Sequence, residues 1–299
     1  MVEKEEMVSS NDGTARRTGS MPDPAVLSFM TARVKNQPHN TAFSVYEEGF
    51  WRSMSYAEIR HRSNVLSSWL IEQSLQHGSR VAVLSESKPE WGIAFFTIVR
   101  AGGIVLPLDR TLTIEELEPI IQDAQPSAIL ASATYLETAE ILCKRVHGIE
   151  HIIVMEDESL PGRYQSYREL KPSAGVIDVR ERQWDELAVL TYTSGTTGTP
   201  KGIVRDIGGH IVALKWTMKN IYNIDPDDVW WSASDIGWIV GHSYIVYAPL
   251  FHGCTTVLFE GKPVGTPDAG VFWRIISEYK VKSLFTAPTA FRAIKKEDP

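Results

Sequence analysis

Short apolar segments alternate with longer amphipathic segments along most of the chain, and this alternation limits the possible folds more than any other feature of the sequence. Clear boundary signals separate the segments. Ser55 and Thr113 each begin a capping box at a helix start, and Pro89 suits a first helical turn. Gly78 is placed to end the first of these helices. The pattern predicts an α/β fold of alternating strands and helices, with largely parallel sheets and helices on both faces.

The same signals assign most of the sequence to individual elements. The predicted strands are 80–85, 104–106, 127–131, 151–155, 187–192, 229–233, 255–259 and 283–286. The predicted helices are 55–77, 89–100, 113–123, 135–145, 209–222, 269–279 and 288–296, with mixed helix over 236–249. The polar stretch 156–186 is expected to be a long excursion between strands. Residues 1–20 are predicted to be a disordered leader, because they contain almost nothing to bury.

The composition argues against several classes of protein. The chain has 299 residues, enough for one large or two medium domains, with 30 Lys and Arg against 37 Asp and Glu and a net charge of −7. No nucleic-acid partner is expected, since a general nucleic-acid binder usually carries a basic excess. Cys143 and Cys254 form neither a metal-binding pattern nor a disulfide framework, which favours a reducing, cytoplasmic compartment. No apolar run reaches the length of about 18 residues that a membrane span needs.

A loop rich in hydroxyl groups and glycine follows the predicted strand 187–192. Its chemically important residues are Thr193, Ser194, Gly195, Thr196, Thr197, Gly198, Thr199 and Lys201. The glycines let the backbone approach a ligand, the hydroxyls are short donors, and the lysine adds a positive charge, a combination that suits a polyphosphate. The loop also lies at the carboxyl end of a strand, where α/β sheets bind ligands. Pro200 and Gly202 on either side of the lysine exclude a Walker A loop, and the alternative is a flexible Ser/Thr/Gly linker.

Several segments carry a resemblance to a known family. Residues 192–202 resemble the signature loop of the AMP-forming acyl-CoA synthetases, which belong to the adenylate-forming superfamily. Residues 230–244 resemble the second core segment of short-chain acyl-CoA synthetases. Residues 259–268 and 284–292 are more similar to the propionate-type branch of these enzymes than to the acetate-type branch.

The first half of the chain resembles a different branch. Residues 80–91 and 101–108 are similar to long-chain acyl-CoA or acyl-AMP ligases, so the sequence resembles a junction of two branches near residue 187. The resemblance implies the N-terminal portion of the adenylate-forming large domain. Its N-terminal subdomain would occupy 21–186, and an incomplete second subdomain over 187–299 would carry the phosphate loop and the acyl pocket.

The resemblance also implies an activity. Members of the family couple a carboxylic acid to ATP with release of pyrophosphate and then pass the acyl group to a thiol, usually that of coenzyme A, while Mg²⁺ bridges phosphate oxygens. In this chain the loop 193–201 would hold the phosphates, and His242 would be the catalytic histidine near the α-phosphate and the carboxylate. No residue is assigned as a metal ligand. The residues expected to wall an acyl pocket for a short acid, of the propionate or acetate class, are Trp238, Ile239, Val240 and Gly241. Plain core packing is the alternative for His242 and for the apolar run 238–240.

Some features depart from the family pattern. Val240 stands where acetate ligases carry a threonine, and Val264 where they carry an asparagine near coenzyme A. The later adenine and ribose segments and the C-terminal domain with its catalytic lysine are not found, and Lys295 and Lys296 are expected to be a solvated pair. The sequence leaves open a non-catalytic nucleotide-binding remnant, a longer-chain ligase, a generic phosphate-loop NTPase and the oligomeric state. The sheet that begins at Val229 is expected to expose an apolar edge that promotes aggregation.

Overall fold

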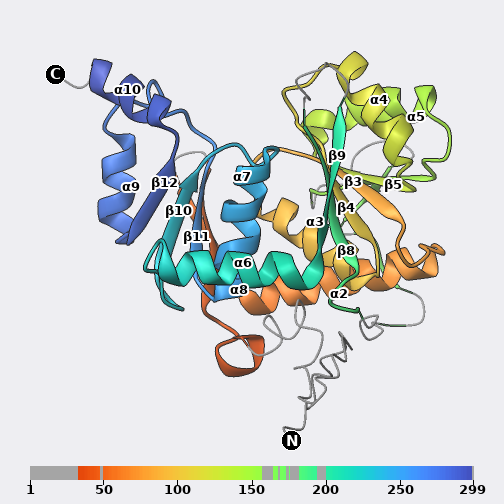
Figure 1. Cartoon of the computed structure of the whole chain (residues 1–299), viewed down its shortest axis with the longest axis horizontal. Helices are drawn as coiled ribbons and strands as arrows, with labels where there is room; N and C mark the ends of the chain where they lie inside the picture. The colour runs from red at the N-terminus through yellow and green to blue at the C-terminus, as the bar shows by residue number, and fades with distance from the viewer. Residues whose placement is uncertain are drawn as a thin grey trace, which may run out of the picture.

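The computed structural model describes residues 33–47, 50–156, 164–167, 169–172, 175, 182–193 and 200–297. These residues form two sheets with helices packed around them (Figure 1). The predicted leader at 1–20 lies outside the described residues. Among the described helices, none is both long enough and apolar enough to cross a membrane. The α/β architecture predicted from the alternation is confirmed.

The larger sheet has seven strands in the order β7-β6-β5-β3-β4-β8-β9. Its strands are β3 (Arg80–Leu84), β4 (Ile104–Pro107), β5 (Ala128–Ala131), β6 (His151–Val154), β7 (Gln165–Ser166), β8 (Leu187–Thr193) and β9 (Lys201–Asp206). All neighbours are parallel except β8 and β9, which form an antiparallel hairpin. The helices that connect or follow its strands are α3 (Pro89–Arg100), α4 (Ile114–Ala124), the short turn η1 (Ala133–Tyr135), α5 (Leu136–Arg145) and α6 (Ile207–Asn220).

The environment of strand β3 shows why the apolar runs in the strands of this sheet are continuous rather than alternating with polar residues. Val81 and Val83 pack in one core with α2 (Tyr56–Glu72) and α3, whereas Ala82 and Leu84 pack in a second core with α4 and α5. Successive side chains of a strand point to opposite faces, so helices on both faces bury every residue. All four side chains are fully buried.

The smaller sheet has five strands in the order β12-β10-β11-β1-β2. Its strands are β1 (Thr41–Glu47), β2 (Phe50–Ser55), β10 (Val229–Ala233), β11 (Thr255–Phe259) and β12 (Ser283–Thr286). The remaining helical elements are α7 (Ile239–His242), the π-helical turn η2 (Ser243–Tyr247), α8 (Ala248–His252), α9 (Val271–Tyr279) and α10 (Pro288–Glu297). Strands β1 and β2 are antiparallel, and the other neighbours are parallel.

The expected division at residue 187 does not coincide with the division between the sheets. Strands β8 and β9 lie on its C-terminal side but complete the seven-stranded sheet, because β8 pairs with β4. Strands β1 and β2 lie on its N-terminal side but join the five-stranded sheet, because β1 pairs with β11. Pairing between distant segments, which a local pattern does not contain, determines which sheet a strand joins.

Most predicted element ends agree with the structure, and the exceptions have local causes. Helix α3 has the predicted bounds, and both capping boxes are present. Helix α2 ends at Glu72 rather than near residue 77, because Ser74 adopts a left-handed conformation with φ 66°. Helix α6 begins two residues early because the carboxylate of Asp206 accepts the N–H of His210 and caps it.

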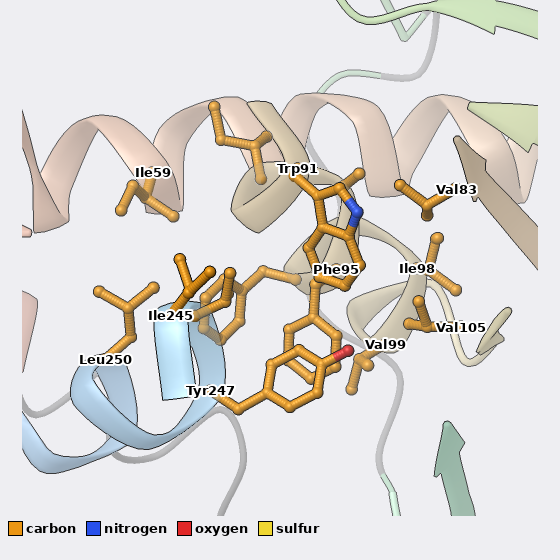
Figure 2. Close-up of a cluster of buried hydrophobic side chains, with 14 of the residues drawn as sticks. Ile59, Val83, Trp91, Phe95, Ile98, Val99, Val105, Ile245, Tyr247 and Leu250 are labelled. Carbon is orange, nitrogen blue, oxygen red and sulfur yellow. The ribbon is translucent and has the colours of Figure 1, made fainter. Parts of the chain in front are cut away.

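One core lies between the two sheets. Figure 2 shows Trp91 and Phe95 of α3 facing Ile245 and Tyr247 of η2, with Leu250 of α8 beside them. The rings of Phe95 and Tyr247 are 4.1 Å apart between centroids. Helix α3 connects strands of the seven-stranded sheet, whereas η2 and α8 connect β10 to β11 of the other sheet. This aromatic contact therefore fixes the two sheets against each other.

Tyr56 provides a second link and a testable contribution to stability. Its buried hydroxyl donates to the main-chain oxygen of Cys254 at 2.6 Å, joining the start of α2 to the segment before β11. Tyr56→Phe is expected to lower the free energy of unfolding by about 1–2 kcal/mol, because the carbonyl of Cys254 loses a buried donor. Urea denaturation measures the change. Tyr46→Phe is the control, since no hydrogen bond of the Tyr46 hydroxyl is found in the described part of the chain, and an equal loss in both variants would contradict the prediction.

Candidate functional site

The two ends of the expected phosphate loop are held together by the β8–β9 hairpin. Thr193 is paired with Lys201 in antiparallel register, and Tyr192 is paired with Gly202. Thr193 is half-buried, and Lys201 is exposed. The expected loop residues Ser194, Gly195, Thr196, Thr197, Gly198 and Thr199 lie outside the described residues, so their role stays a prediction. What the structure establishes is a fixed stem on which the loop is carried.

Tyr192 anchors this stem to helix α4. Its hydroxyl donates to the carboxylate of Asp123, in the last turn of α4. Its ring covers Gly202, where an added Cβ would lie 3.4 Å from the Tyr192 Cζ atom. Burial, followed by the hydrogen bond and charge of Asp123, raises the pKa of Tyr192. The sequence analysis included Tyr192 in the resembling segment 192–202 but did not predict its contact with Asp123, because only the folded chain brings α4 beside the end of β8.

The second expected segment lies against the neighbouring strand of the same sheet. Gly237 packs on the backbone of Leu108 and Asp109, since a Cβ added to it would lie 3.4 Å from the Leu108 oxygen and 3.2 Å from the Asp109 Cα atom. These two residues directly follow β4, which is the parallel neighbour of β8. The phosphate-loop stem and the segment 235–242 therefore lie at the carboxyl ends of two adjacent strands, β8 and β4, at the edge where α/β sheets bind ligands.

The expected acyl-pocket residues have different environments. Trp238 is 58% exposed and Val240 is 45% exposed, while Ile239 is intermediate. Two large apolar side chains are thus available on the surface of this segment. Gly241 is buried and serves close packing instead: an added Cβ would lie 1.6 Å from the main-chain oxygen of Asp235. Their assignment to an acyl pocket stays a prediction.

The space at Gly241 gives a direct stability prediction. Gly241→Ala is expected to lower the free energy of unfolding by about 3 kcal/mol or more, because the methyl group meets rigid backbone rather than a flexible side chain. Urea denaturation at neutral pH measures the effect. Gly270→Ala is the matched control, since its nearest contact is the mobile end of Arg274. A loss at position 241 no larger than at position 270 would show that α7 moves away easily.

His242 lies in the hydrophobic core. It is fully buried, its ring is stacked on Trp91 with 5.8 Å between centroids, and it also contacts Tyr247. Burial, with smaller contributions from the charges of His210 and Arg205, lowers the pKa of His242 to about 3. The imidazole is therefore neutral at physiological pH. In this structure the His242 ring points from α7 into the hydrophobic core, and its catalytic role stays a prediction.

His210 is a second buried histidine that the sequence analysis did not identify. It lies in the first turn of α6, is 8% exposed and contacts the Tyr247 ring edge-on. Burial, followed by the charge of Arg205, lowers its pKa to about 4. No sequence pattern links His210 to His242. The two residues come together in the fold because the β8–β9 hairpin brings the start of α6 to this core.

Other predicted features are located in the described residues. Lys295 and Lys296 are exposed at the end of α10, as expected for a solvated pair, and Val264 is half-buried beside the core under α9. Within the described ranges, no three His, Cys, Asp or Glu residues are arranged to hold a metal ion.

Comparison with known proteins decides the family. Residues 30–299 match the family described as AMP-binding enzyme. The chain belongs to the AMP-binding enzyme family. Two relatives of this AMP-binding enzyme are acyl-CoA synthetase short-chain family member 3, mitochondrial, of Mus musculus, 37% identical over 270 residues, and propionate–CoA ligase of Salmonella typhimurium, 33% identical over 263 residues. These alignments cover 83% and 82% of the AMP-binding chain but only 39% and 42% of the relatives.

Solved structures confirm the fold of the AMP-binding chain. The acyl-CoA synthetase of Brucella canis superimposes with a TM-score of 0.78, covering 92% of this chain and 49% of that one. The anthranilate CoA ligase AuaEII in complex with anthranoyl-AMP gives a TM-score of 0.79, covering 90% of this chain and 51% of that one. Both are 22% identical in sequence, so they bear on the architecture alone.

Proposed function

We propose that this chain is part of a ligase that activates a short-chain carboxylic acid, of the propionate or acetate class, with ATP. The carboxylate oxygen attacks the α-phosphorus, the bond to the β-phosphate oxygen breaks, and an acyl-adenylate and pyrophosphate form. The thiol of coenzyme A then attacks the acyl carbon, and AMP leaves. The supporting observation is that the phosphate-loop stem follows β8 and that the segment 235–242 packs on the residues that follow its parallel neighbour β4.

The site residues have distinct roles in this proposal. Lys201, exposed at one end of the loop stem, neutralises phosphate charge, and the loop hydroxyls and amides donate to phosphate oxygens. Phosphoryl and adenylyl transfers depend mainly on positioning the reactants and on stabilising charge, so a stem that holds the loop in place contributes directly to catalysis. Mg²⁺, when bound together with ATP, would supply further positive charge to the triphosphate. Because the described part of the chain offers no cluster of three metal-ligating side chains, we derive no step through the ion.

The preference for a short acid rests on the relatives and on Trp238 and Val240. A bulky indole and a branched side chain on one segment limit the room for an acyl chain. Each methylene changes such discrimination by about 1–3 kcal/mol, so propionate and acetate are expected to differ modestly. A longer acid is the alternative, and it predicts rates that rise with chain length.

The experiment is acid-dependent exchange of labelled pyrophosphate into ATP with the purified 299-residue chain. Acetate, propionate, butyrate, hexanoate and octanoate are compared at equal concentrations, and ATP binding is followed in parallel by calorimetry. Exchange that is highest with acetate or propionate supports the proposal. Exchange that is highest with octanoate supports the longer-chain alternative. ATP binding without exchange indicates a nucleotide-binding module, and phosphate release without any acid indicates an NTPase.

A further inference from the structure

Arg110 and Asp235 form an ion pair between the two sheets. Arg110 follows β4 of the seven-stranded sheet, and Asp235 follows β10 of the five-stranded sheet, 125 residues later. Oδ2 of Asp235 accepts hydrogen bonds from Nε of Arg110 at 3.0 Å and from Nη2 at 2.7 Å. Both side chains are partly buried, with 30% and 23% of their surfaces exposed.

Asp235 also shapes the segment that carries the expected acyl-pocket residues. Its Oδ1 accepts the N–H of Gly237 at 2.9 Å, and its main-chain oxygen accepts the N–H of Trp238 at 3.2 Å. The same main-chain oxygen fills the space beside Gly241. One residue thus contacts three positions of the segment, and any displacement of Asp235 is passed to Trp238 and to helix α7.

The electrostatics of the pair favour a fixed geometry. Partial burial opposes the charge on Arg110, but the hydrogen bond and charge of Asp235 outweigh it, and the pKa of Arg110 is raised. The side chain of Tyr135 adds to this stabilisation. A guanidinium that contacts a carboxylate through two nitrogens, partly shielded from water, is held more firmly than an exposed surface pair.

We propose that Arg110 is a positioning residue, whose contact with Asp235 fixes Trp238 and Val240 and thereby sets the selection between short and longer acids. This inference rests on the proposed function. Arg110 lies outside the segments whose resemblance identifies the phosphate loop and the acyl pocket, so those motifs assign it no role. Lysine cannot replace it fully, because an ammonium group lacks the planar fork that makes the two-nitrogen contact.

The first test measures acid selectivity in Arg110→Gln and Arg110→Lys. Arg145→Gln is the matched control, since it removes an arginine from an exposed ion pair with Glu118. In acid-dependent pyrophosphate exchange, both variants at position 110 are expected to lose about tenfold in the propionate-to-hexanoate ratio of kcat/KM, with KM for ATP changed less than about twofold. Adding Asp235→Asn to Arg110→Gln is expected to cause no further loss, because the pair acts as a unit.

The second test does not need activity. The nine tryptophans are replaced by 5-fluorotryptophan, and the fluorine resonance of Trp238 is assigned with Trp238→Phe. This resonance is expected to shift in both variants at position 110 and to stay in Arg145→Gln. If Arg110→Gln does not fold, Arg110→Lys alone is compared with the wild type and with Arg145→Gln.

The outcomes separate the inference from the function on which it rests. An unmoved Trp238 resonance in a folded variant overturns the role of Arg110, as does an unchanged acid ratio in an active one. A rise in KM for ATP equal to the loss in acid selectivity also overturns it, since that result indicates general damage. If the wild-type chain catalyses no exchange, the proposed function fails for the 299-residue chain by itself, and the fluorine spectrum alone decides on Arg110.

Discussion

Lowering the pH from 6.5 to 4 is expected to reduce the free energy of unfolding by roughly 5–6 kcal/mol through His210 and His242 alone. Both imidazoles are buried in the core around Tyr247, and their pKa values are lowered to about 4 and about 3. Because a domain of ordinary stability has only about 5–15 kcal/mol in total, this loss brings the protein close to unfolding.

The direction follows from proton binding in the two states. The unfolded chain binds protons on these histidines below their ordinary pKa of about 6.5, whereas the folded chain stays unprotonated until the pH falls to about 4 and about 3. The stabilisation is therefore fully present above pH 6.5. Each histidine then removes about 1.4 kcal/mol per pH unit as the pH falls through the window down to its folded pKa. The fixed charge of Arg205, which lowers both pKa values, acts in the same direction.

Urea denaturation at half-unit steps of pH measures the slope. The double variant His210→Gln/His242→Gln is expected to lose at least half of the pH dependence between 6.5 and 4, because glutamine does not titrate. His61→Gln is the control, since it makes the same substitution at an exposed position on α2. Equal slopes for the wild type and the double variant would remove the buried pair as the cause.

The elements that the sequence predicted well are those whose signals are local. Capping residues at Ser55 and Thr113 and the proline at position 89 act within one helical turn, and the structure confirms the helices they begin. Strands β1, β2 and β9 were not predicted. Their residues become strands because they pair with β11, with each other and with β8, and such pairing depends on contacts that a local pattern does not contain.

The same distinction between local signals and tertiary contacts applies to the candidate site. The sequence predicted a buried strand directly before the expected phosphate loop, and β8 confirms that strand. It could not supply the partners that hold the site: Tyr192 needs Asp123 of α4, 69 residues earlier in the chain, and Asp235 needs Arg110. It left open whether His242 packs in the core, and in the structure α3 and η2 enclose the ring. Burial of a polar residue depends on tertiary packing more than on its neighbours in sequence.

Lys201→Ala is expected to lower kcat/KM for ATP about 100-fold in acid-dependent pyrophosphate exchange, which corresponds to about 2.7 kcal/mol of lost transition-state stabilisation. A charge-assisted contact between an ammonium group and a phosphate is worth about 1.5–3 kcal/mol, and an exposed alanine leaves no group in its place. Lys201 lies on β9, an edge strand, and its side chain is exposed, so the substitution is expected to leave the urea midpoint unchanged.

The control for Lys201→Ala is Lys296→Ala, which removes the same charge from an exposed position on α10. Comparing the two variants separates a local contact with phosphate from a change in net charge, because only a local contact depends on position. Lys201→Arg keeps the charge and is expected to retain more exchange than Lys201→Ala, since a positive charge near the phosphates still neutralises them. Exchange in Lys201→Ala within about threefold of the wild type would mean that the triphosphate is held elsewhere, and the β8–β9 hairpin would then lose its place at the centre of the site.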